Sequence, residues 1–60
     1  MKLIDLLKVI HEDECLWLYD CNNRKNYFYT NPAKVNACHN DKEVMTMGTT
    51  GEGTLEIYIK

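Results

Sequence analysis

The first ten residues have the apolar spacing of an amphipathic helix, with Asp5 and Lys8 on its polar side. The acidic run Glu12–Glu14 follows, and acidic side chains oppose the dipole at a helix C-terminus, so we expect the helix to end near Val9. A helix this short is unstable alone in water and must dock on another element. Its apolar stripe consists of Leu3, Leu6, Leu7 and Ile10.

Alternating patterns further along the chain predict two β-hairpins. Residues 15–21 and 26–30 read as strands joined by a short polar turn, which is typical of a hairpin. A second pair, residues 43–47 and 54–59, is separated by the glycine-rich segment 48–53.

Between the hairpins, Asn31 and Pro32 favour a helix start, because Asn is a good N-cap and Pro suits the first helical position. We expect one or two helical turns over residues 33–38. The order predicts a single α+β domain over residues 1–60. Its N-terminal helix packs on one face of a small, mostly antiparallel sheet of about four strands, two hairpins joined by a short helical turn. The expected inward set is Leu16, Leu18, Phe28, Leu55, Ile57 and Ile59, with Leu3, Leu6, Leu7, Ile10, Val35 and Val44.

The remaining strand residues should lie on the opposite face of the sheet, and one short helix leaves that face uncovered. Tyr, Trp and Met are enriched at protein interfaces. The face can therefore be a half-solvated sheet surface, a self-association surface or a docking site for a dedicated partner. Its expected members are Trp17, Tyr19, Tyr27, Tyr29, Met45, Met47 and Tyr58, with Glu56 among them.

Length and charge narrow the function classes. With 60 residues, 45% of them hydrophobic, the chain can stabilise only one small core. The net charge of −2 and the lack of a basic stripe disfavour nucleic-acid binding, although aromatic side chains on a sheet can stack bases. The apolar N-terminal stretch is too short and too charged for a membrane helix or an export signal, so we expect a cytoplasmic protein.

The three cysteines are expected to be reduced thiols without a cofactor role, because an odd count does not suit a closed disulfide framework. A Cys21–Cys38 disulfide would need an oxidising compartment. A metal site of Cys15, Cys21, Cys38 and His39 is disfavoured, since a strand would hold its first two thiols about 20 Å apart. Cys38 and His39 are adjacent, so their side chains usually point apart, and no third group orients the imidazole. We therefore expect no enzyme and no metal.

The predicted opening helix, the segment EDECLWLYD and the closing segment GTLEIYIK together resemble small uncharacterised proteins encoded by phages and prophages of Firmicutes. The resemblance covers most of the chain. It implies a helix-plus-sheet fold and a host-interaction or inhibitory role, and it assigns no functional residue.

The leading hypothesis is a non-enzymatic protein–protein interaction module, an accessory protein of a mobile element or an inhibitor of a host factor. Its partner would be a second copy of the chain, a host protein, or both. The aromatic face would make the contact, and Glu12, Asp13 and Glu14 would form an acidic docking patch. A second hypothesis is an oligomer that sequesters a nucleotide-type small molecule, with Arg24 and Lys25 contacting the ligand. A third is a small metal-stabilised module.

Overall fold

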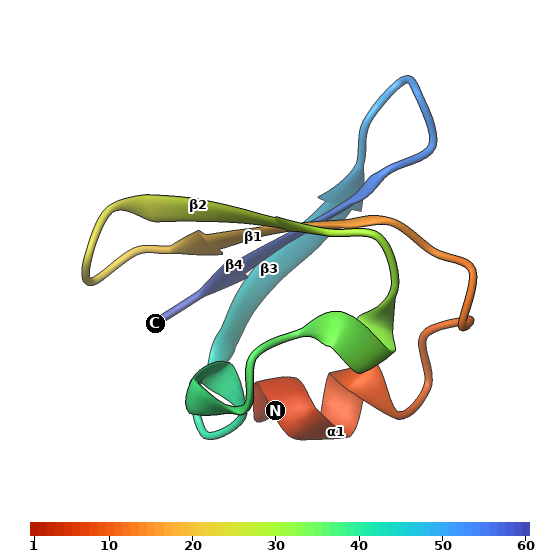
Figure 1. The fold of residues 1–60 in the computed structure, drawn as a ribbon. Helices are drawn as coiled ribbons and strands as arrows, with labels where there is room; N and C mark the ends of the chain where they lie inside the picture. Colours follow the sequence, from red (N-terminus) through yellow and green to blue (C-terminus); the bar gives the residue numbers. More distant parts are fainter.

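The computed structural model describes all residues from Met1 to Lys60 and shows a small α+β fold built on one four-stranded sheet (Figure 1). A short helix precedes the first hairpin, and two 3-10 turns connect the hairpins. The elements are α1 (Leu3–Leu7), β1 (Leu16–Asp20), β2 (Lys25–Tyr29), η1 (Pro32–Lys34), η2 (Ala37–His39), β3 (Val44–Thr49) and β4 (Leu55–Ile59).

The sheet is mixed, with the strand order β2-β1-β4-β3. Both predicted hairpins form, and each is antiparallel. The two hairpins meet at the centre of the sheet, where β1 and β4 run parallel with Leu16 opposite Leu55 and Leu18 opposite Ile57. The segment between β2 and β3 makes this arrangement possible, because it crosses on the same side of the sheet as α1 (Figure 1).

Helix α1 is shorter than the predicted helix and ends at Leu7. Its N-cap residue, Lys2, makes no side-chain capping bond, so the sequence does little to stabilise the helix by itself. The helix is instead held by the chain before β3: the Leu3 amide donates to the Lys42 carbonyl at 2.8 Å, and the Ile4 amide donates to the Asn40 carbonyl at 3.1 Å. These bonds satisfy amides that have no partner within a helix.

The predicted helical turn is a pair of 3-10 turns. Asn31 precedes the first of them, as expected, but its side chain makes no capping bond. Asn36 caps the second turn, accepting a hydrogen bond from the Cys38 amide at 3.0 Å.

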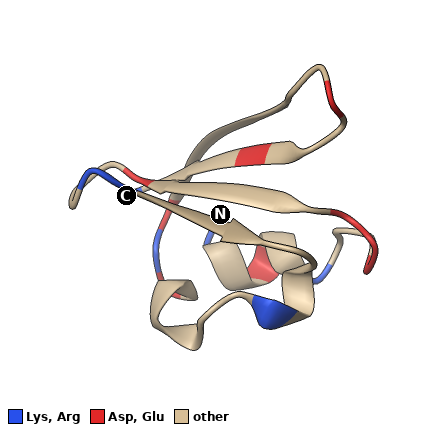
Figure 2. Ribbon diagram, turned by 45° about the horizontal axis from the view of Figure 1, so that its top comes forward, with Lys and Arg blue, Asp and Glu red and all other residues tan.

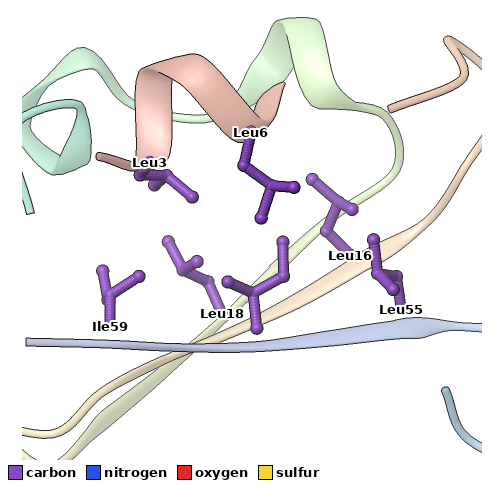
Figure 3. Close-up of a cluster of buried hydrophobic side chains, with 7 residues drawn as sticks. Leu3, Leu6, Leu16, Leu18, Leu55 and Ile59 are labelled. Carbon is purple, nitrogen blue, oxygen red and sulfur yellow. The ribbon is translucent and has the colours of Figure 1, made fainter. Parts of the chain in front are cut away.

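Seven aliphatic side chains from α1, β1 and β4 form the core, between the helix and one face of the sheet (Figure 3). All seven belong to the predicted inward set. Leu7, Ile10, Val35 and Val44 pack against them and are only partly buried. The core consists of Leu3, Leu6, Leu16, Leu18, Leu55, Ile57 and Ile59.

The prediction for β2 was wrong by one position. Phe28 was expected in the core, but it lies opposite Trp17 on the other face and is 47% exposed. Tyr27 and Tyr29 take the core side, opposite Leu18 and Leu16, and pack against the core. Directly paired residues share a face of the sheet, so the register of the hairpin sets this phase.

A buried carboxylate closes the end of β1. The Asp20 side chain is fully buried and accepts a hydrogen bond from Lys42 Nζ at 2.5 Å. It also accepts from the backbone amides of Asn22 and Asn23, at 3.0 and 3.2 Å, and from Asn23 Nδ2 at 2.8 Å. The bonds from Lys42 and Asn23 outweigh burial and hold the pKa of the Asp20 carboxyl well below its usual value. Asp20 thus fixes the β1–β2 turn and ties it to the chain before β3.

Replacing Leu18 with Ala should unfold much of the population, because truncation of a fully buried leucine costs about 2–5 kcal/mol, which is comparable to the whole stability of so small a domain. Val9→Ala is the matched control, since Val9 is 77% exposed. The urea concentrations at the midpoint of unfolding, monitored by circular dichroism, give the comparison. Equal midpoints for the two variants would contradict this assignment of the core.

The Asp20–Lys42 pair predicts a specific loss of stability in acid. The folded-state pKa of Asp20 lies below its unfolded value of about 3.9, so its contribution to stability is present above that pH. The contribution is lost as the pH falls below about 4 toward the folded-state pKa. Asp20→Asn should therefore lower the melting temperature at pH 7 and flatten its acid dependence.

Asp41→Asn is the control for this measurement, because the Asp41 side chain is 93% exposed and lies 3.9 Å from Lys2 in a solvated pair. Thermal melts from pH 7 to pH 3 should give the wild-type profile for Asp41→Asn. The same profile for Asp20→Asn would exclude the role assigned to the buried carboxylate.

Candidate functional site

The face of the sheet opposite the core, here called the outer face, carries the candidate site. The helix and both 3-10 turns lie on the core side (Figure 1), and the strand register determines which side chains point outward. Trp17 and Tyr58 were predicted on this face and are 43% and 36% exposed. By register its members are Trp17, Tyr19, Asn26, Phe28, Thr46, Gly48, Glu56 and Tyr58.

Four aromatic rings from three neighbouring strands form two pairs on the outer face. The ring centroids of Trp17 and Phe28 are 5.0 Å apart, at an interplanar angle of 54°. Those of Tyr19 and Tyr58 are 5.6 Å apart, at 58°. Tilted pairs at these distances are favourable, so the rings support one another although they are not fully buried. We call these four residues the outer aromatic cluster.

An open pocket of about 320 Å³ lies on this face beside the cluster, at the lower end of the size range of small-molecule sites. Glu56, from the central strand β4, is its only charged residue. The pocket is lined by Trp17, Tyr19, Asn26, Thr50, Glu56, Ile57 and Tyr58.

Glu56 and Tyr58 form a hydrogen-bonded pair in the pocket. The Tyr58 hydroxyl donates to Glu56 Oε2 at 3.3 Å. The negative charge of Glu56 and this hydrogen bond raise the pKa of the Tyr58 phenol above its usual value.

Tyr27 and Tyr29, which the sequence placed in the same surface, form a separate cluster on the core side. Both pack around His39, with ring centroids 4.7 Å from it for Tyr27 and 6.4 Å for Tyr29. The Tyr29 hydroxyl lies 3.3 Å from His39 Nε2. Burial, followed by the positive charge of Lys42, lowers the pKa of His39. A buried imidazole in contact with the core sheet face is a packing element, so we exclude these residues from the candidate surface.

The two methionines predicted for the site lie along β3, at an edge of the sheet. Met47 pairs with Ile57 and therefore faces the core side, yet it is 47% exposed because it lies at the edge. Met45 lies at the irregularity between Val44 and Thr46 and is 54% exposed. The structure does not bring either of them into the pocket.

The charged segments singled out in the sequence lie at opposite ends of β1 (Figure 2). The acidic run Glu12–Glu14 precedes the strand, in the loop after α1. Arg24 occupies the β1–β2 turn with a φ of 56°, and Lys25 opens β2 opposite Asp20. None of these residues lines the pocket.

The residues proposed as metal ligands are not assembled into a site. Cys15, Cys21 and Cys38 are free thiols. No group of three or more His, Cys, Asp or Glu side chains lies close enough together to hold a metal ion. This geometry gives no support to the hypothesis of a metal-stabilised module.

The structure contains no helix with the length and apolar character needed to cross a membrane. In comparisons with known proteins, no family model, curated protein or solved structure matches the chain.

Proposed function

We propose that this chain is a non-enzymatic protein-binding module that contacts its partner through the outer aromatic cluster. The observation that carries the proposal is two aromatic ring pairs on a face that no other element covers. Three of the four rings, those of Trp17, Phe28 and Tyr58, are exposed. Aromatic side chains are enriched in interface hot spots, because they bring a large contact area at a low cost in conformational entropy. Contiguous apolar surface of this kind marks interaction sites.

The charges favour a basic partner over a second copy of the chain. Glu56 is the only charged residue on the outer face, and the whole chain has a net charge of −2. A second copy docking through the same face would bring another Glu56 and the same net charge into the contact. A basic partner would neutralise Glu56, and the Glu12–Glu14 run would attract it over longer distances.

A nucleotide-sequestering function has less support. A pocket for a phosphate needs cationic side chains, whereas this pocket contains a carboxylate. Arg24 and Lys25, the residues expected to contact such a ligand, lie at and after the β1–β2 turn. The resemblance to phage- and prophage-encoded proteins supports a host protein as the partner, with inhibition by occupancy of its surface as the mode of action.

The proposal predicts that a partner binds through the outer face and that two separate substitutions there remove binding. Tagged wild-type protein, Trp17→Ser and Phe28→Ser are each incubated with lysate of a Firmicutes bacterium, the kind of host that the resemblance implies. The retained proteins are then quantified by mass spectrometry. A protein retained by the wild type is then purified and titrated by calorimetry. Either substitution should weaken its binding by about tenfold or more, the size expected for an interface hot spot.

Val9→Ser is the matched control, because it replaces an exposed apolar side chain with serine at a position away from the sheet. Circular dichroism verifies that all three variants remain folded. The proposal would be contradicted if the wild type retained no protein more strongly than the folded outer-face variants do. It would also be contradicted if wild type and Trp17→Ser bound the purified partner with equal affinity.

A further inference from the structure

Glu56 stands out among the charged residues of the sheet, because it is partly buried and has no cationic partner. The Lys and Arg side chains that form ion pairs do so with other acids, and Glu56 takes part in none. Its carboxylate has one side-chain hydrogen bond, from the Tyr58 hydroxyl. A partly desolvated carboxylate is stabilised by a nearby cation, and the folded chain provides no cation for the Glu56 carboxylate.

None of the outward residues in the strand register is Lys or Arg, and no cation of the chain forms an ion pair with Glu56. Figure 2 shows Lys and Arg positions at the β1–β2 turn and on the segments below the sheet. Lys25 is the only basic residue within a strand, and it pairs with Asp20 on the core side. Lys42 is already engaged by the Asp20 carboxylate. Glu56 is therefore free to pair with a cation from another molecule.

The rings around Glu56 suit a planar cation. Trp17, Tyr19 and Tyr58 line the same pocket, and the faces of such rings attract cations electrostatically. A guanidinium stacks on aromatic faces and donates two parallel hydrogen bonds to a carboxylate, which a lysine ammonium cannot do. Asn26 also lines the pocket, and its side-chain oxygen is an acceptor for a remaining N–H group.

We propose that this pocket binds the side chain of an arginine from a protein partner, with the guanidinium between the aromatic rings and the Glu56 carboxylate. The inference rests on the proposed function and specifies its partner: a protein that presents an arginine at the centre of the contact. The open space beside the site supports access, since Gly48 lies opposite Glu56 and a Cβ atom at this position would meet no atom within 4 Å.

The test uses N-acetyl-arginine amide as the probe, added to the ¹⁵N-labelled full chain and followed by NMR. Chemical-shift changes should centre on the Trp17 indole N–H and on the amides of Glu56 and Tyr58, and should saturate. N-acetyl-norleucine amide, a neutral probe with an unbranched apolar side chain, should produce none at equal concentration. N-acetyl-lysine amide should bind more weakly than the arginine probe.

Two variants distinguish a specific role of the Glu56 carboxylate from a general effect of the negative charge of the chain. Glu56→Gln should weaken binding of the arginine probe by about fivefold, the size expected for a solvent-accessible ion pair. Glu52→Gln removes an equal charge in the β3–β4 turn and should bind like the wild type. The inference would be overturned if the norleucine probe bound as well as the arginine probe, or if the lysine probe bound more tightly. It would also be overturned if Glu56→Gln and wild type bound the arginine probe equally, or if the chemical-shift changes were confined to residues 12–14.

The purified partner distinguishes failure of this inference from failure of the proposed function. If Trp17→Ser abolishes partner binding while Glu56→Gln and wild type bind equally, the protein-binding role stands and the arginine pocket is wrong. If neither substitution changes partner binding, the outer face is not the contact and both proposals fail.

Discussion

The structure depends on the burial of seven aliphatic side chains against a single face of the sheet. A chain of 60 residues cannot enclose both faces of four strands. The free energy that so short a chain gains by burying apolar surface barely exceeds the cost of the conformational entropy lost on folding. The five-residue helix covers the core with Leu3 and Leu6 alone. The same constraint leaves the outer face open, so the large rings there are not covered by another element.

The buried Asp20 carboxylate fixes the geometry that this core requires. It lies at the end of β1, accepts the amides of the following turn and pairs with Lys42, which comes from the segment that crosses to β3. One side chain therefore links the first hairpin to the crossover, next to the parallel pairing of β1 with β4. A buried charge is tolerated here because Lys42 and the amides replace its hydration. The sequence alone does not reveal this role, because nothing near Asp20 distinguishes it from an exposed turn aspartate.

Alternation predicted β1 and β4 well, because their inward positions are leucine or isoleucine, apart from Asp20 at the end of β1, and their outward positions are aromatic or charged. The same reasoning failed for β2, where Tyr27, Phe28 and Tyr29 are too similar in hydrophobicity to show the phase. Counting from the turn would have shown it: a four-residue loop pairs Asp20 with Lys25 and hence Trp17 with Phe28. The polar run from Asp20 to Asn26 does not reveal where that loop begins.

Three further features depend on contacts between distant segments and could not be predicted from local sequence patterns. The parallel pairing of β1 with β4 joins two hairpins that are each complete in the sequence, and only the crossover decides how they meet. The helix ends early because its stability comes from the carbonyls of Asn40 and Lys42 and from its two buried leucines, not from its own sequence. The pocket around Glu56 was missed for the same reason, because it combines residues from all four strands or their ends.

Trp17, the only tryptophan, lies in the outer aromatic cluster and reports directly on the central claim that this face is open. The most direct measurement is its fluorescence in the isolated, folded chain, with acrylamide as the quencher. The account predicts an emission maximum close to that of a solvent-exposed indole and efficient quenching by acrylamide. When a partner binds, the emission should shift to the blue and the quenching should decrease. Blue-shifted emission that acrylamide does not quench in the isolated monomer would show a buried indole and would contradict the account.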